Sequence, residues 1–374
     1  MGGIVRVGEV VEAMEGIAPP ALALAGDGAG LQAGDPGAKV GRILVCLDAS
    51  LPALARAGGM GAQMLVSHHP RFYRGLDSLA GDRPAGRRAA ALAASGLAVY
   101  SAHTSLDLAE GGVNDCLARA AGLEGAGVIK PEKRERLVKL AVFVPAERVE
   151  EVRAAVCRAG AGAIGKYSEC TFRTRGTGTF RCGPETKPFQ GRPGSFEEAD
   201  EYRLETVFGE FSAPRVVAAM LAAHPYEEVA YDLYPLRGTA RVYGFGRAGS
   251  LPGPEPLAKL AARLARVTAS RMTQYFGRPD RPVRRLGVWA GGGLDVGAAL
   301  AAGVEALAVG EIGYHEVEDL ADAGVSLVVL GHGCSERPVL RPLARRLRAA
   351  LGNRVKVDVM PDAGFSLRNA GPEG

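Results

Sequence analysis

The chain has 374 residues, of which 47% are hydrophobic and 23% charged, and its 45 basic and 41 acidic residues leave a net charge of +4. This composition excludes an intrinsically disordered chain, and the length predicts two or three domains at about 150 residues each. The small positive excess favours neither a nucleic acid nor a membrane as partner. Because no apolar run reaches the ~20 residues that cross a bilayer, we expect a soluble protein, located in the cytoplasm.

The first part of the chain has a β-α-β pattern. Short β-branched apolar runs of the kind found in buried parallel strands cover residues 42–48, 64–67 and 97–101. Helical patterns separate these runs at residues 51–58 and 85–94. We therefore predict three parallel strands joined by helices.

The middle of the chain has a different pattern, and we predict that residues 130–240 form an inserted domain. It opens with a charged connector at 130–136. The elements expected after it are a strand at 137–144, a helix at 145–159, Gly/Thr-rich hairpin segments at 170–182, a loop at 183–200, a strand at 202–208, a helix at 213–223 and a strand at 229–236. The order β-α-β-β-α-β is that of a ferredoxin-like α+β domain.

The last part of the chain returns to the first pattern. Strands are expected at 285–290, 306–309 and 325–330, with a helix at 294–302, and leucines at helical spacing predict an amphipathic helix within 337–354. The expected fold class is therefore α/β, with two related halves, residues 1–129 and 241–374, forming one core around the inserted domain at 130–240.

Four of the six histidines follow predicted strands, and two of these have a carboxylate four residues further on. The histidines are His68, His69, His103 and His332, and the carboxylates are Asp107 and Glu336. Side chains gather at the carboxyl ends of strands in open α/β sheets. A single such histidine is more often a hydrogen-bonded loop residue, but their coincidence at three strand ends favours a metal site. Imidazole and carboxylate suit Zn, Mn, Fe or Co, and five ligands drawn from these six residues match two ions about 3.5–4 Å apart.

The six cysteines form no CxxC pair, so we expect free thiols and a metal held by nitrogen and oxygen alone. Two further histidines are less informative. His315, with Glu316 and Glu318, either lines the same cavity or interacts only within its own helix start. His224, in the inserted domain, is expected to be structural.

Five motifs along the chain together resemble the Nif-three-like family, which comprises dinuclear metal-centre proteins and GTP cyclohydrolase I type 2 homologues. In chain order they are VSHHP (66–70), SAHTSLDLAEGGVND (101–115), HPYEEVAYDLYPL (224–236), GEIGYHEVEDL (310–320) and GHGCSE (331–336). The insert resembles the PII-like or CutA-like domain of one subgroup. The resemblance implies a homohexamer whose metal sites face an internal cavity.

The same resemblance implies specific site residues. The ligands of two metal ions would be His68, His69, Asp107, His332 and Glu336, and His103 would lie at the rim of the site. Two segments depart from the family pattern. Residues 26–31 lack its usual aromatic and amide side chains, and residues 290–293 replace a cysteine-glycine-glycine-serine loop.

Hydrolysis is the reaction class that two such ions favour, because they activate water at neutral pH. The expected substrate is a small molecule, with a nucleotide as one candidate, and His103 is the candidate for proton transfer. The alternative is a non-catalytic, metal-loaded scaffold or regulator whose PII-like insert senses a ligand.

Overall fold

The computed structural model describes residues 3–72 and 80–361 and divides the chain into two compact units. The first, here called the core unit, comprises Met1–Lys133 and Tyr243–Gly374, and the second, the middle unit, comprises Arg134–Val242. The chain leaves the core unit within strand β5 (Glu124–Pro145) and returns within strand β8 (Tyr231–Pro256). The core is therefore built from two distant parts of the sequence.

The first sheet of the core unit has the strand order β1-β4-β3-β2-β13. Its strands are β1 (Gly30–Ala33), β2 (Arg42–Asp48), β3 (Met64–His69), β4 (Ala98–Ser101) and β13 (Lys356–Val359). All pairs are parallel except β1 with β4. Helices α2 (Leu51–Gly59) and α3 (Pro84–Ser95) contribute buried residues to one apolar cluster with this sheet. The register pairs Asp48 with His69 and Ser67 with Ser101, so the carboxyl ends of the three central strands lie level.

The other sheet has eight strands in the order β6-β7-β5-β8-β10-β11-β12-β9, and the core unit contains its part β8-β10-β11-β12-β9. Its shorter strands are β9 (Gln274–Phe276), β10 (Pro282–Trp289), β11 (Ala306–Val309) and β12 (Ser326–Val329). Strands β10, β11 and β12 are parallel and end level, with Trp289, Val309 and Val329 in register. The helices of this half are α8 (Leu257–Thr268), α9 (Val296–Ala301) and α10 (Tyr314–Asp322). The two related strand patterns expected from the sequence therefore appear as two sheets.

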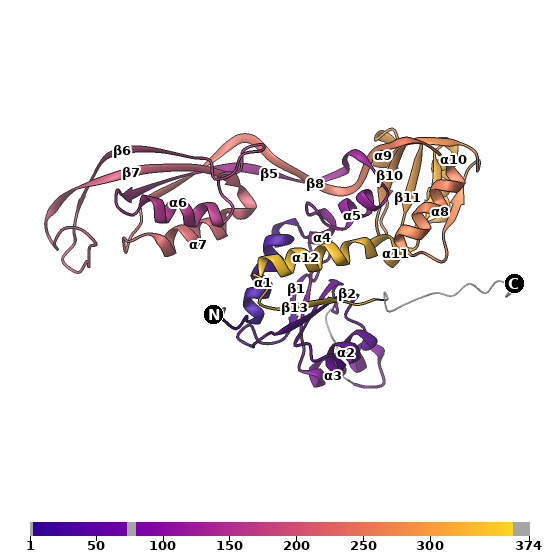
Figure 1. Cartoon of the computed structure of the whole chain (residues 1–374), viewed down its shortest axis with the longest axis horizontal. Helices are drawn as coiled ribbons and strands as arrows, with labels where there is room; N and C mark the ends of the chain where they lie inside the picture. Colours follow the sequence, from indigo (N-terminus) through magenta and orange to yellow (C-terminus); the bar gives the residue numbers. More distant parts are fainter. Residues whose placement is uncertain (1–2, 73–79, 362–374) are drawn as a thin grey trace. The chain divides into compact units, whose positions relative to one another are not determined.

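Several helices belong to neither strand-helix repeat. They are α1 (Val7–Ile17), η1 (Pro20–Leu22), α4 (Thr104–Leu108), α5 (Val113–Ala120), α11 (His332–Glu336), η3 (Arg337–Val339) and α12 (Leu340–Ala350). Helix α12 is the expected amphipathic helix; it buries Leu340, Leu343 and Leu347 and packs against α1 and β2 (Figure 1). Strand β13 then pairs with β2, so the last part of the chain completes the first sheet.

The middle unit has the element order β-α-β-β-α-β. After β5 come α6 (Val149–Arg158), β6 (Thr171–Arg181), β7 (Phe196–Gly209), η2 (Glu210–Ser212) and α7 (Ala213–Ala223), and β8 closes the unit. Its strands are ordered β6-β7-β5-β8. Buried residues of α6 and α7 share an apolar cluster with alternate residues of β5 and β7, such as Leu140, Val142 and Leu204. Helices thus cover one face of this part of the sheet (Figure 1).

Two segments of the middle region differ from the sequence prediction. The charged connector expected at 130–136 lies inside β5, and the last five residues of the loop expected at 183–200 belong to β7. In both cases the charged residues belong to a strand that pairs with a neighbouring strand, whereas their local composition alone predicts a polar loop. Of the helices in the described residues, none is long and apolar enough to span a membrane.

Candidate metal centre

The two sheets of the core unit supply the candidate site residues from level strand ends. His68 and His69 are the last two residues of β3, which extends two residues beyond the strand predicted at 64–67. His103 is the N-cap residue of α4, which follows β4, and Asp107 lies inside that helix. The other sheet contributes His332 and Glu336, the first and last residues of α11. Because residues four apart lie on the same face of a helix, the side chains of His332 and Glu336 extend from the same face of α11.

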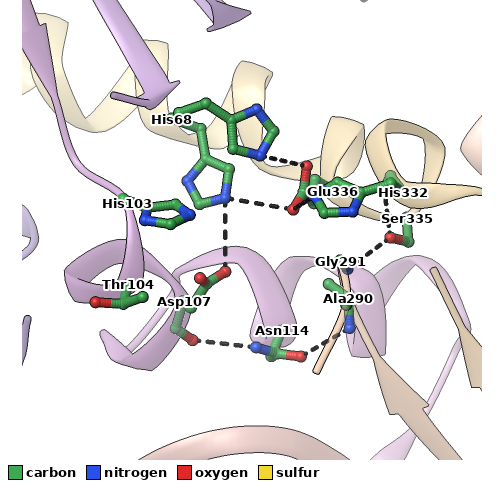
Figure 2. Close-up of polar contacts among 12 residues, drawn as sticks. His68, His103, Thr104, Asp107, Asn114, Ala290, Gly291, His332, Ser335 and Glu336 are labelled. Atoms are coloured by element: carbon green, nitrogen blue, oxygen red, sulfur yellow. Dashed lines mark hydrogen bonds and ion pairs between the residues drawn. The ribbon is translucent and has the colours of Figure 1, made fainter. Parts of the chain in front are cut away.

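Glu336 is the central residue of the cluster (Figure 2). Its Oε1 lies 3.5 Å from His68 Nε2 and 3.1 Å from His332 Nε2, and its Oε2 lies 3.3 Å from His69 Nε2. Ligand-type atoms of His68, His69 and Glu336 all lie within 4.8 Å of one another. One carboxylate from the second sheet therefore meets three imidazole rings, two of which come from the first sheet.

Asp107 and His103 lie on the other side of His68. Asp107 Oδ1 is 3.7 Å from His68 Nε2. The His103 ring centroid lies 5.5 Å from that of His68 and 5.7 Å from that of His69. The structure thus brings all six predicted residues together.

Each of the four clustered histidines has a hydrogen-bond acceptor at its ring nitrogen Nδ1. None of these acceptors is among the site residues predicted from the sequence. The four pairs are His68 with the carbonyl oxygen of Ala102 (3.0 Å), His69 with Asp48 (2.9 Å), His103 with Asp27 (2.5 Å) and His332 with Glu311 (3.0 Å). Since carbonyl and carboxylate oxygens only accept, Nδ1 carries the proton and donates it. In the neutral ring, Nε2 then holds the lone pair, which is the arrangement that outer partners impose on metal-binding histidines.

The partners Asp27, Asp48 and Glu311 were not predicted from the sequence. Asp48 is the last residue of β2 and Glu311 follows β11 by two residues, so the strand-end rule that selected the histidines also applied to them. Asp27 lies in the segment 26–31 that departs from the family pattern, and the carboxylate remains there although the aromatic and amide residues do not. It also accepts a hydrogen bond from the backbone N–H of Thr104.

Three buried atoms at the centre of the cluster have no hydrogen-bond partner among the described residues: His68 Nε2, His69 Nε2 and Glu336 Oε2. His68 and Glu336 are only 1% and 3% exposed. A buried polar atom without a partner costs about 1–3 kcal/mol, so their convergence calls for a group that binds nitrogen and oxygen lone pairs. A divalent transition-metal ion fits this donor set.

The charges in the cluster are strongly coupled. Although burial opposes it, the positive charges of His68, His332 and His69 beside the carboxylate hold the pKa of Glu336 well below its ordinary value. For His69, burial lowers the pKa, but the adjacent carboxylates of Asp48 and Glu336 outweigh this effect and raise the pKa to about 10. The hydrogen bond to Glu336 is the main cause that raises the pKa of His332 to about 9. The carboxylates thus create a site that stabilises positive charge.

Two buried polar residues, Asn114 and Ser335, hold the loop at 290–293 beside the site (Figure 2). Asn114 on α5 donates to the backbone oxygen of Asp107 and accepts from the backbone N–H of Ala290. Ser335 accepts from the backbone N–H of Gly291 and donates to the backbone oxygen of His332. Both side chains are fully buried. The loop at 290–293 is therefore held against α5 and α11 by hydrogen bonds to its backbone.

Gly291 shows why this loop needs glycine. Its φ is +70°, and a Cβ atom there would lie 2.7 Å from Glu336 Oε1. Gly293 in the same loop has φ +71° but open space at its Cβ position. We expect Gly291→Ala to displace the Glu336 carboxylate and lose bound metal, whereas Gly293→Ala should bear only backbone strain of about 1 kcal/mol. Elemental analysis of both variants checks this, and equal metal contents would contradict it.

The remaining two histidines lie outside the cluster. His315 on α10 is exposed and pairs with Glu318 at 3.0 Å, within its own helix. His224 donates from Nε2 to the backbone oxygen of Phe143 and accepts at Nδ1 from the backbone N–H of Tyr226. Burial lowers the pKa of His224, as expected for a neutral ring with both nitrogens used in packing the middle unit.

The fold and the cluster together define a two-sheet α/β protein with a histidine-carboxylate site between level strand ends. Residues 5–363 match the family model described as Duf34/NIF3 (NGG1p interacting factor 3), and the chain belongs to that family. It is 38% identical over 324 residues to a Halalkalibacterium halodurans protein named GTP cyclohydrolase 1 type 2 homolog, covering 86% of this chain and 87% of that one. A Bacillus subtilis protein of the same name is 35% identical over 347 residues, which cover 92% and 93% of the two chains.

A solved structure supports the same assignment. The crystal structure of a Bacillus cereus protein related to NIF3 matches with a TM-score of 0.81 and 32% identity, over 96% of this chain and 98% of that one. The resemblance read from the five sequence motifs is thereby confirmed at the level of the family.

Proposed function

We propose that this protein binds two divalent transition-metal ions, of Zn, Mn, Fe or Co, and acts as a metal-dependent hydrolase. The observation that carries the proposal is the convergence of three buried, unpartnered atoms, His68 Nε2, His69 Nε2 and Glu336 Oε2. In this proposal the ions are held by His68, His69, Asp107, His332 and Glu336. Glu336 serves both ions, because its two oxygens face different histidines.

Bound ions would supply Lewis-acid polarisation and lower the pKa of a water molecule. The protein's own contribution is orientation and proton transfer. The Nδ1 partners keep each Nε2 directed into the site, at distances of 2.5–3.0 Å. His103 is the proposed general acid–base group, since Asp27 fixes its ring beside His68 and His69. Protonation of a departing nitrogen or oxygen is the step that such a group performs.

We propose a small-molecule substrate, with a nucleotide as the candidate class. The support is the name of the curated relatives, GTP cyclohydrolase 1 type 2 homolog, at up to 38% identity. Opening a purine ring by hydrolysis requires water to add at a ring carbon and a proton to reach the departing nitrogen. The candidate residues provide groups for both requirements.

The proposal also includes the type of the middle unit, the assembly and the cellular location. The middle unit is proposed to be a PII-like or CutA-like domain, supported by its β-α-β-β-α-β element order and its strand order β6-β7-β5-β8. The assembly is proposed to be a homohexamer and the location the cytoplasm, both on the resemblance to the family.

The proposal is tested on protein purified without chelators. Elemental analysis should give about two transition-metal ions per chain. A panel of nucleotides, phosphoesters and amides should include one substrate whose turnover disappears on chelation and returns on adding metal. Full metal loading with no turnover across the panel would favour the non-catalytic scaffold instead, and protein without metal would refute the site itself.

A further inference from the structure

Unpartnered buried polar atoms concentrate in one short segment of the chain. Besides His68 and His69, this segment contains Arg71, whose Nε and Nη2 atoms are buried and have no hydrogen-bond partner among the described residues. Arg71 lies two residues after His69, so at most about 7 Å separates their Cα atoms. Leaving buried guanidinium nitrogens without an acceptor is costly, and such atoms are normally paired.

The surroundings of Arg71 do not neutralise its charge. Burial lowers the pKa of Arg71, the positive charge of Arg88 on α3 lowers it further, and only Asp48 acts in the opposite direction. Asp48 Oδ1 already accepts from His69 Nδ1. Two positive charges thus lie near one carboxylate that is engaged with a histidine, and an anion at this position would relieve the imbalance.

The backbone around Arg71 is held on both sides. Before it, the backbone oxygen of His69 accepts from the hydroxyls of Ser67 and Ser101. After it, the backbone N–H of Phe72 donates to Gln32 Oε1 at 3.2 Å. A side chain on such a fixed support loses little further conformational freedom when it binds a ligand, which favours affinity.

We propose that Arg71 binds a phosphate group of the substrate, through Nε–H and Nη2–H, beside the candidate metal ligands. These two N–H groups point in parallel along one edge of the guanidinium plane, the geometry that matches two oxygens of one phosphate. The proposal rests on the proposed function and narrows its substrate class to phosphate-bearing small molecules. The unpartnered Nε2 atoms suit a cation and the unpartnered Arg71 nitrogens suit an anion, which together match a metal-bound phosphate compound.

The test is calorimetric titration with inorganic phosphate, on metal-free protein and on protein loaded with Mn²⁺. Arg71→Gln should bind phosphate about 10- to 100-fold more weakly, since hydrogen bonds to a charged group contribute about 1.5–3 kcal/mol. Arg87→Gln is the matched control: it removes a charge from α3, where Arg87 bonds only backbone oxygens of Gly81 and Asp82 in the described chain, and should change the affinity less than about twofold.

Thermal unfolding separates a binding role from a structural one. Metal-free Arg71→Gln should melt at or above the temperature of the parent, because the substitution removes an uncompensated charge. A melting temperature several degrees lower would overturn the proposal, as would unchanged phosphate affinity in this variant. Acetate bound as tightly as phosphate would overturn the assignment to a phosphate group.

The result also separates this inference from the proposed function. If the protein binds no metal but its phosphate affinity still depends on Arg71, the metal centre fails and the anion site stands. If two ions bind and phosphate affinity is indifferent to Arg71, the anion site alone is refuted.

Discussion

Glu336→Gln should lower the metal content from about two ions per chain to less than one. The substitution preserves the size of the side chain and removes its charge, so it tests the carboxylate rather than the packing. The expected loss is large because the oxygens of this one residue lie within 3.1–3.5 Å of Nε2 atoms of three histidines. Elemental analysis after extensive dialysis measures it.

Glu318→Gln provides the control for that experiment. Glu318 is an exposed carboxylate on α10 that also pairs with a histidine, His315, but lies outside the cluster. The Glu318→Gln variant should retain the metal content of the parent protein. Retention of two ions in Glu336→Gln would mean that Glu336 is not shared by the ions, and the ligand assignment proposed above would have to be abandoned.

His103→Gln should keep both ions and lower the rate of any metal-dependent hydrolysis by about 10²- to 10⁴-fold, the usual effect of losing a general acid–base group. The metal should remain because the backbone, not the ring, holds the turn that carries Asp107. The backbone oxygen of His103 accepts from the N–H groups of Leu106 and Asp107, and glutamine preserves it. Metal content and rate are measured on the same preparation.

Two comparisons make this result interpretable. Asp27→Asn removes the carboxylate that orients the His103 ring, and should lower the rate while leaving the metal content unchanged. His315→Gln, at an exposed position outside the cluster, should affect neither quantity. If His103→Gln loses metal in parallel with activity, the ring supports the Asp107 segment; if rate and metal are both unchanged, His103 has no part in the mechanism.

The argument from strand ends is the part of the sequence interpretation that identified most of the candidate site residues. It selected His68, His103 and His332 because apolar runs ended beside them, and such runs depend only on local residue pattern. Strands β2 and β11 and helix α7 have the predicted bounds for the same reason. Local pattern decides which residues leave a sheet at its edge, although it does not say which two sheets meet.

Features that depend on distant pairing were not predictable in this way. The charged segment at 130–136 became part of β5 because a long neighbouring strand pairs with it. Asp27 lies 76 positions from His103, and only the folded chain shows that it holds the His103 ring. No spacing rule links them, because their contact depends on the path of the backbone between strands.

The sequence by itself indicated membership in the family, through the five motifs, and the identities of the candidate ligands. The α/β pattern follows from short-range periodicity, and the candidate histidines and carboxylates follow from the residue types at the predicted strand ends. The tertiary structure alone decided that β13 of the last segment completes the first sheet beside β2 and that Gly291 leaves room for the Glu336 carboxylate. It alone also shows that two buried nitrogens of Arg71 have no partner among the described residues. Each of these depends on contacts between residues far apart in the chain, which no local pattern encodes.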